Sequence, residues 1–424
     1  SLRRARAPAS LRRGVCLQRA GRMAGQPTAT FPVDSVRVPT NSTQAEMFLS
    51  KYPECDGRNV VVAILDTGTD PGAPGLNATC PDGRPKVIDV VDATGSGDID
   101  VSTVRQATVA DGKLTVEGKS GRTLTLNDGW SNPTGDFRVG AKPLYDVIPG
   151  GLASRIKKAR QKALDEAQRA ATAKARTVLS EFDAAHPASK SLSEEDKGTQ
   201  RELKAQLEQL ENAESVVEDL GPMIDAAVWH DGSAWRAVVG TADDGDLSAL
   251  EPLTNFRAER KYGTFMGDNL DPAGTLMNYA VNIFDEGSVL SVVCDSGAHG
   301  THVAGIVGAC HADAPEFNGV APGAQIVAVK IGDSRLDGME TASALVRGLR
   351  TVLDNGCDLI NLSFGEAASP PNVGRFLEKA AEVVNKHGVI FISSAGNNGP
   401  AYTTVGAPGG TCEEIISCGA YVTP

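Results

Sequence analysis

The sequence predicts an α/β fold with a doubly wound parallel sheet, because short apolar runs alternate with amphipathic helical segments. Runs that are apolar on both faces are typical of strands buried in a parallel sheet. Such runs occupy residues 60–65, 326–329, 359–362, 389–393 and 415–418. Helices are expected at 341–353 and 373–386. Because ligands of such sheets bind at the carboxyl ends of the strands, the residues after each run are the first candidates for a site.

The composition indicates a soluble globular protein with room for two or three domains, since 41% of its 424 residues are hydrophobic and 22% are charged. The net charge of −12 argues against nucleic acid and anionic membranes as partners. No apolar run reaches the roughly 20 residues that span a bilayer. The 8 cysteines contain no Cys-x-x-Cys pair. We therefore expect reduced thiols, most of them small core residues, and a cytoplasmic protein.

The first 22 residues are rich in arginine and contain no acidic residue, after which Met23 begins a plainer segment. A transit peptide has this composition. A leader that precedes a true start at Met23 is the interpretation we prefer, because residue 1 is a serine. In either case residues 1–22 are not expected to belong to the fold.

A long segment between the first strand and the later ones, residues 76–290, is predicted to be an inserted α+β domain. It would separate residues 23–75, with the first strand, from residues 291–424, which continue the sheet but leave it incomplete. Its middle, 152–220, splits near His186 and Pro187 into two segments with apolar residues at helical spacing. A helical hairpin packed on a partner is the prediction, and a solvated charged helix is the alternative. Residues 226–229 and 235–239 predict a β-hairpin whose turn follows an exposed His230.

Three polar side chains stand where a parallel sheet would gather them. Asp66 ends the first strand, His299 opens a segment of small residues, and Asn397 lies in a glycine-rich turn after the strand at 389–393. A carboxylate can orient an imidazole that acts as general base on a serine hydroxyl. An amide can donate to the oxygen on which negative charge develops. The three residues therefore predict acyl-transfer chemistry.

Other interpretations exist for each piece alone. Asp66 could be a phosphorylated aspartate, but that chemistry needs a second acid two positions later, where Gly68 stands. His299 and His302 could bind a metal, yet no third ligand follows at metalloprotease spacing. We expect no metal and interpret His302 as a buried, hydrogen-bonded histidine at a helix start. Asn397 on its own could equally be an ordinary turn residue.

The order Asp66, His299, Asn397 with its flanking residues resembles the subtilisin family of serine peptidases. The resemblance implies that Asp66 orients the imidazole, His299 is general base and acid, and Asn397 is the oxyanion donor. Residues 360–365 resemble the family's substrate-binding strand, in which Ser363, Phe364 and Gly365 would pair with an extended peptide. The family's Gly-Thr-Ser-Met nucleophile motif is absent up to residue 424. We therefore expect a truncated gene product that is inactive as given.

From about residue 52 to 424, the chain resembles the tripeptidyl-peptidase II branch of that family. The features that carry the resemblance are the long separation of residues 66 and 299 and the segments 66–75, 297–302 and 393–400. This implies a serine exopeptidase that releases tripeptides from free amino termini through an acyl-enzyme, downstream of larger proteases in cytosolic protein turnover. It also implies a large homo-oligomer, peptide substrates and no cofactor.

Two acids acquire a role through this resemblance, because the branch is associated with glutamates that hold the substrate ammonium. The matching residues are Glu340 and Glu366. Without the resemblance, Glu340 would favour a helix amino end and Glu366 would be a solvated loop acid. The alternative function for the whole chain is a catalytically dead binding or assembly module of the same fold.

Overall fold

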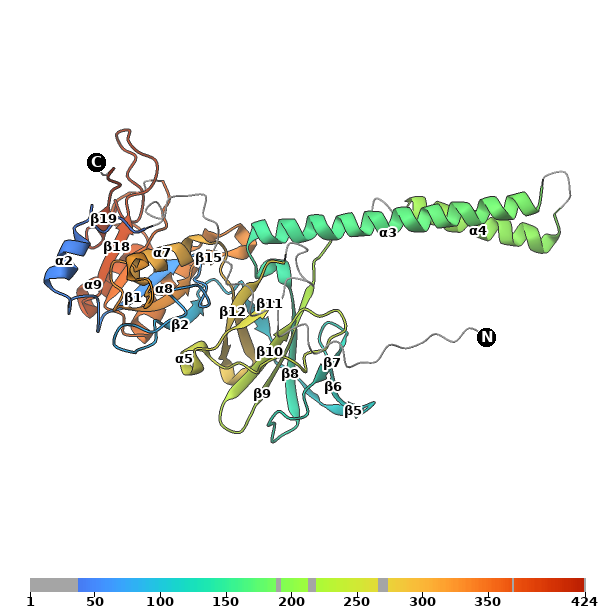
Figure 1. Cartoon of the computed structure of the whole chain (residues 1–424), viewed down its shortest axis with the longest axis horizontal. Helices are drawn as coiled ribbons and strands as arrows, with labels where there is room; N and C mark the ends of the chain where they lie inside the picture. Colours follow the sequence, from blue (N-terminus) through green and yellow to red (C-terminus); the bar gives the residue numbers. More distant parts are fainter. Residues whose placement is uncertain (1–36, 188–191, 213–218, 266–273, 368–369, 423–424) are drawn as a thin grey trace.

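The computed structural model describes residues 37–187, 192–212, 219–265, 274–367 and 370–422 (Figure 1). The arginine-rich residues 1–22, together with Met23, lie outside this part of the chain.

A six-stranded sheet of order β19-β18-β17-β1-β14-β2 forms the centre of the protein. Every neighbouring pair in it is parallel, which confirms the predicted doubly wound sheet. The strands are β1 (Val61–Asp66), β2 (Val87–Asp92), β14 (Gln325–Lys330), β17 (Leu359–Leu362), β18 (Ile390–Ser394) and β19 (Ile416–Cys418). Five of the six coincide with predicted runs to within two residues.

Helices cover both faces of this sheet, because alternate side chains of each strand point to opposite sides. Ala63 and Leu65 of β1 share one apolar cluster with α8 (Ala342–Asp354) and α9 (Arg375–His387). Val62 and Ile64 share another with α7 (His299–Gly308) and α5 (Phe256–Glu259). Both predicted helices, 341–353 and 373–386, are therefore confirmed as α8 and α9.

Strand β2 was not predicted, although it is hydrogen-bonded to β14 at the edge of the sheet. Asp89 and Asp92 interrupt its apolar residues, so the sequence lacks the continuous apolar run of a buried strand. Asp89 is buried, and its Oδ2 accepts a 3.0 Å hydrogen bond from Asn355 Nδ2. The segment 76–290 thus contributes a strand to the main sheet, and we propose that the inserted domain begins after Asp92.

The remainder of the insertion is largely antiparallel, with two four-stranded sheets and one of three strands. The first has the order β10-β9-β8-β4 and the second the order β11-β12-β13-β3. Its strands are β3 (Asp98–Asp100), β4 (Thr103–Gln106), β5 (Thr108–Ala110), β6 (Lys113–Glu117), β7 (Thr123–Leu126), β8 (Asp136–Pro143), β9 (Met223–His230), β10 (Trp235–Gly240), β11 (Gly263–Phe265), β12 (Met277–Phe284) and β13 (Val289–Val293). Strands β9 and β10 form the predicted β-hairpin, and His230 is exposed as expected.

The insertion is attached to the main sheet by apolar packing. Ala280 of β12 and Val293 of β13 belong to the cluster that contains Val62 and Ile64 of β1. Short elements complete the described chain: α2 (Ala45–Lys51), η3 (Leu144–Asp146), η5 (Asp285–Gly287), η6 (Pro315–Phe317), η7 (Ser334–Leu336), β15 (Gly332–Asp333) and β16 (Met339–Glu340).

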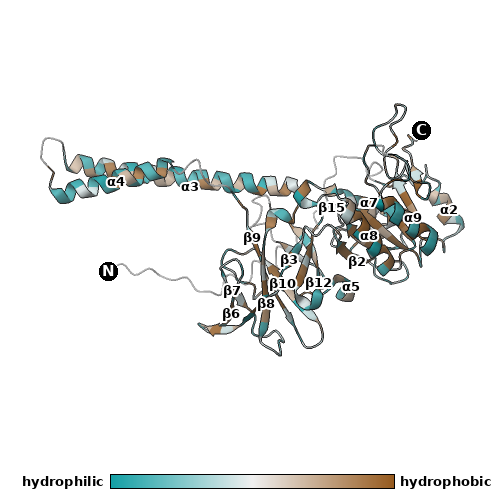
Figure 2. Ribbon diagram, turned by 180° about the vertical axis from the view of Figure 1, so that it is seen from behind, coloured by the Kyte–Doolittle hydropathy of each residue, from teal (hydrophilic) through white to brown (hydrophobic). Residues whose placement is uncertain are grey.

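The predicted helical hairpin is present as α3 (Gly150–Ala185) and α4 (Glu194–Asn212), which are separated near His186 and Pro187 as expected. It projects away from the rest of the molecule, and it is mainly hydrophilic whereas the strands of the main sheet are mainly hydrophobic (Figures 1 and 2). Only Leu152 and Ile156, near the base of α3, are buried, and α4 has no buried residue. The two helices pack on each other, which leaves their outer faces in solvent.

No helix within the described ranges is both long enough and apolar enough to cross a membrane.

The hairpin should therefore be dispensable for folding. Replacing residues 169–209 by Gly-Ser-Gly is expected to change the melting temperature by less than about 3 °C. The linker then joins Gln168 to Leu210, which are already in contact because Gln168 Nε2 donates to Leu210 O at 2.8 Å. Ile156→Ala is the matched control and should cost about 2–5 kcal/mol, since Ile156 is fully buried. Loss of cooperative unfolding in the shortened chain, measured by circular dichroism, would contradict this.

Candidate active site

Strand β1 delivers Asp66 to the carboxyl end of the main sheet, where its side chain is fully buried. Asp66 Oδ1 accepts a 2.7 Å hydrogen bond from the backbone N–H of Thr67. The same oxygen lies 2.7 Å from Nδ1 of His299, the first residue of α7. The predicted pair is therefore in direct contact, although 233 positions separate the two residues.

This contact defines which nitrogen of His299 can react. Nδ1 faces a carboxylate, which can only accept, so Nδ1 carries a proton and Nε2 is the ring nitrogen free to take one. The His299 side chain is 54% exposed, whereas that of Asp66 is 0% exposed. The imidazole is thus anchored on its buried side and open to solvent on the other, as a general base requires.

Thr67 ties the start of α7 to the loop that follows β1. Its Oγ1 donates to Gly297 O at 2.8 Å and accepts from Gly300 N at 2.9 Å. Its carbonyl accepts from Ser296 N at 2.7 Å. A Cβ added to Gly300 would lie 2.1 Å from Gly68 O, so only glycine permits this approach. Glycine at position 300 therefore allows α7 to lie against the end of β1.

The interpretation of His302 as a buried, hydrogen-bonded residue is wrong. Gly300, Ala304 and Gly308 form the buried face of α7, and residue 302 lies on the outer face, where it is exposed. Thr67 holds the helix start instead.

Burial perturbs the carboxylates around the imidazole. It raises the pKa of Asp66 above the ordinary value, against the opposing hydrogen bonds from His299 and Thr67. Burial also raises the pKa of Asp295 to about 6, and the neighbouring charge of Asp70 adds to that shift.

Lys330 supplies positive charge beside these acids and was not anticipated. It is fully buried at the end of β14, opposite Asp66 in the register of the sheet. Its Nζ donates to Ser96 Oγ at 2.9 Å and to Ser334 Oγ at 3.0 Å. Lys330 partly offsets the rise in the pKa of Asp295. The position of this lysine directly after the apolar run 326–329 could have indicated a buried charge at the end of that strand.

The predicted substrate strand, residues 360–365, begins within β17, but β17 ends at Leu362 and residues 363–365 continue beyond it. Strand β17 is the direct neighbour of β1 in the sheet. Phe364 places its ring edge-on to the His299 ring, with centroids 6.2 Å apart. Ser363 Oγ donates to Asn361 Oδ1 at 3.0 Å. A Cβ at Gly365 would lie 2.7 Å from Ala407 O, which explains the glycine. Ser363, Phe364 and Gly365 thus lie in a backbone segment that reaches the imidazole.

Glu340 and Glu366 line one pocket of about 200 Å³. Glu340 comes from β16, immediately before α8, and Glu366 follows Gly365. The backbone of Glu366 is fixed, because its N–H and carbonyl both bond to Ala407, at 3.0 and 3.1 Å. The rest of the lining is mainly apolar: Ala342, Leu345, Val373, Phe376, Leu377 and Pro408. The cap of α8 is Thr341, whose Oγ1 accepts from Ala344 N.

Asn397 lies in an exposed turn after β18, two strands away from β1. The preceding residue, Gly396, has a φ of 87°, which favours glycine. Because β18, β17 and β1 run parallel, Asn397 follows its strand at the same carboxyl end of the sheet as Asp66. Its function as an oxyanion donor stays a prediction.

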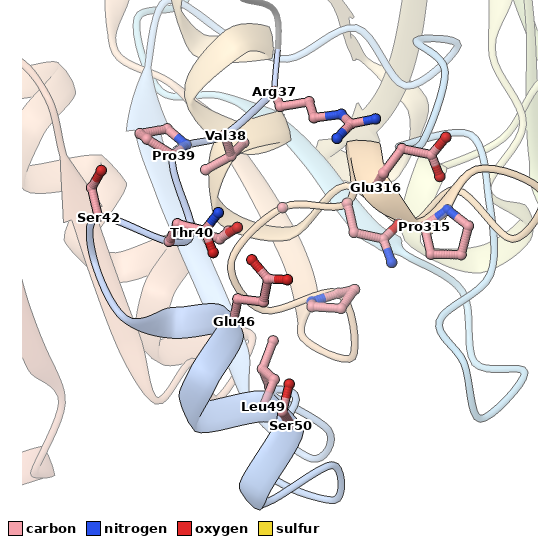
Figure 3. A pocket seen from close by; sticks show the side chains of 14 residues that line it. Arg37, Val38, Pro39, Thr40, Ser42, Glu46, Leu49, Ser50, Pro315 and Glu316 are labelled. Atoms are coloured by element: carbon pink, nitrogen blue, oxygen red, sulfur yellow. The ribbon is translucent and has the colours of Figure 1, made fainter. Parts of the chain in front are cut away.

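A second pocket, of about 750 Å³, lies between residues 37–50 and the loop 315–322 (Figure 3). Arg37, Glu46 and Glu316 are among its charged side chains. None of the predicted site residues lines it, so it does not belong to the site around His299.

Comparison with known proteins places these features in a family. The model of the Subtilase family matches residues 57–423. Tripeptidyl-peptidase 2 of Arabidopsis thaliana is 50% identical over 393 residues, which cover 91% of this chain and 28% of the relative. Tripeptidyl-peptidase 2 of rice is 46% identical over the same shares. A crystal structure of tripeptidyl peptidase 2 superposes with a TM-score of 0.64 at 35% identity, covering 89% of this chain and 29% of that one.

The chain thus spans about 28% of the length of the curated relatives named here. Because the match covers 91% of this chain, most of the insertion lies within it.

Two of the three glycines of α7, Gly300 and Gly305, provide a test of the close approach. Gly300→Ala should lower the free energy of unfolding by about 2 kcal/mol or more, because its Cβ would collide with Gly68 O. Gly305→Ala has no atom within 4 Å and should be neutral or stabilise by roughly 0.5–1 kcal/mol. Urea unfolding measures both. Equal effects of the two substitutions would show that α7 does not depend on contact at residue 300.

Proposed function

Since the chain belongs to the subtilase family, we propose that it carries much of the active site of a serine exopeptidase that releases tripeptides from free peptide amino termini. The observation that carries this proposal is the position of Glu340 and Glu366 in one pocket, at the end of the backbone segment that reaches His299. Two carboxylates that share a pocket attract an ammonium group.

The proposed reaction uses His299 twice. Nε2 of His299 takes the proton of a serine hydroxyl, whose oxygen attacks the scissile carbonyl, while Asn397 donates to the resulting oxyanion. Collapse of the tetrahedral intermediate transfers the proton from Nε2 to the leaving amine and leaves the tripeptide as an acyl-enzyme. Water then repeats the sequence and releases the tripeptide. Asp66 holds the ring orientation and stabilises the imidazolium throughout.

The serine itself is proposed to lie outside these residues, because the 424 positions contain no Gly-Thr-Ser-Met segment. The chain alone is then inactive, and the activity belongs to the full-length protein.

The carboxylate pair would determine the length of the product. An extended peptide advances about 3.3–3.6 Å per residue, so an ammonium held at a fixed point sets which peptide bond reaches His299. Ser363, Phe364 and Gly365 would pair with the backbone in between.

We further propose a cytosolic role in peptide turnover after larger proteases, and assembly into a large homo-oligomer. The free state of all seven described cysteines supports a reducing compartment. The assembly proposal rests on the family resemblance. The alternative of a catalytically dead module gains no support from the relatives, which are named as peptidases.

A requirement for a free amino terminus tests the exopeptidase assignment. The full-length protein should cleave a free-amino tripeptide reporter at least about 100-fold faster, in kcat/KM, than its amino-acetylated analogue, because acetylation removes the charge that the carboxylates bind. Steady-state kinetics with both reporters measure this. Equal cleavage would indicate an endopeptidase of the same fold.

Removing one carboxylate charge should weaken substrate binding without changing the chemistry. Glu366→Gln is expected to raise KM about tenfold, equivalent to about 1.4 kcal/mol, with kcat nearly unchanged. Glu413→Gln changes an exposed acid outside the pocket and is the matched control. If KM stays the same in both variants, Glu366 does not bind the ammonium.

A further inference from the structure

We propose that Lys330 and Ser334 position Glu340, so that the inserted domain takes part in binding the substrate ammonium. This inference rests on the proposed function, because it takes Glu340 as one half of the ammonium site. Neither Lys330 nor Ser334 lines the pocket that contains Glu340. Both therefore act through Glu340, as positioning residues, and do not touch the substrate.

Lys330 carries a charge although its side chain is fully buried. Burial of a charge is costly unless polar groups replace the lost hydration. Its Nζ donates to Ser96 Oγ at 2.9 Å and to Ser334 Oγ at 3.0 Å. Ser96 Oγ in turn donates to Asp92 Oδ2 at 3.2 Å, so one hydroxyl links Lys330 to a counter-charge. Because a buried ammonium loses much free energy when a partner is lost, both serines are held firmly in place.

The contact between Lys330 and Ser334 fixes strand β15. Lys330 precedes this strand and Ser334 follows it, so their hydrogen bond closes a short loop around it. Strand β15 is antiparallel to β16, and Gly332 lies opposite Glu340 in their register. A Cβ added to Gly332 would lie 2.8 Å from Gly338 O, so the two strands approach closely. The backbone position of Glu340 thus depends on the loop that Lys330 closes.

The insertion supports this β15–β16 ribbon from its other side. Ser334 accepts from Lys330 and uses its own proton to donate to Val147 O at 3.0 Å. Val147 lies between η3 and the start of α3. A Cβ added to Gly150, the first residue of α3, would lie 2.7 Å from Asp337 Oδ1. Figures 1 and 2 both show β15 next to the start of α3. The base of the helical hairpin therefore contacts the ribbon at two points.

Glu340 is held between this ribbon and helix α8. Thr341 caps α8 directly after Glu340, so the backbone is fixed on that side by the helix. On the other side it is fixed by the ribbon, and hence by Lys330 and Ser334. The energy of an ion pair falls as its charges separate, so a shift of the ribbon weakens ammonium binding. It leaves the contact between His299 and Asp66 in place, because that contact does not involve the ribbon.

The test compares the free-amino tripeptide reporter with its amino-acetylated analogue, using the full-length protein. Ser334→Ala is expected to raise KM for the free-amino reporter about fivefold and to change kcat less than about twofold. The kcat/KM for the acetylated reporter should change less than about twofold, because that reporter has no ammonium for Glu340 to bind. The preference for a free amine, taken as the ratio of the two kcat/KM values, should therefore fall about fivefold.

A second pair of variants separates positioning from stability. Lys330→Met should lower the preference at least as much as Ser334→Ala. Lys86→Met is its matched control, because Lys86 is also fully buried, with Nζ donating to Pro322 O at 2.5 Å and Ala324 O at 2.6 Å. This control should lower the melting temperature without changing the preference. Ser334→Ala, which retains the buried charge, decides the question if Lys330→Met does not fold. A preference that changes no more in Ser334→Ala than in Lys86→Met would overturn the positioning role.

Glu340→Gln tests whether Ser334 acts through the carboxylate. This substitution alone should lower the preference about tenfold. Adding Ser334→Ala to it should cause no further loss, because the charge that Ser334 positions is already gone. Full additivity of the two losses would contradict the proposal.

The same measurements distinguish failure of this inference from failure of the proposed function. If the unaltered protein cleaves both reporters equally, the ammonium site and the exopeptidase function are wrong. If it requires a free amine but Ser334→Ala retains the full preference, the exopeptidase function stands and the positioning role alone is wrong.

Discussion

The hydrogen bond between His299 Nδ1 and Asp66 Oδ1 is the contact on which the rest of the site depends. It joins the end of β1 to the start of α7 across an insertion of ordinary domain size. The two ends of the insertion must therefore lie close to the same part of the main sheet. Strand β2 meets this constraint at the start by pairing with β14, and β13 meets it at the end by packing on the same apolar cluster. The insertion is thus part of what positions His299.

The glycine at position 300, next to His299, is required by the close approach of two backbone segments rather than by the reaction. Gly300 lies against Gly68 O, and Thr67 bonds to both Gly297 and Gly300. Buried charge is balanced at the same edge, where Lys330 lies opposite Asp66 and offsets part of the shift in Asp295. The imidazole of His299 is therefore held on its Nδ1 side by the buried Asp66, whereas its Nε2 side is open to solvent.

The sequence predicted those features that a local residue pattern determines, and it did not predict those that depend on partners distant in the chain. Strands that are buried on both faces, as at 359–362, were found because such burial produces a nearly continuous run of apolar residues. Strand β2 was missed because Asp89 is buried by a distant partner, Asn355. His302 was misplaced, since the buried face of α7 is set by the contact at Gly300. Lys330 and Asp295 acquire their roles from neighbours that are distant in sequence.

The glutamate pocket shows why charge and shape must be considered together. Glu366 is exposed, so its carboxylate is hydrated in the free protein. Under the proposed function, a peptide with a free ammonium would replace that hydration by an ion pair, whereas a blocked peptide would desolvate two carboxylates without a counter-charge. Discrimination therefore comes mainly from the penalty imposed on the wrong ligand. The mainly apolar lining of the pocket would sharpen this discrimination, because a lining that excludes water strengthens the charge interaction beside it.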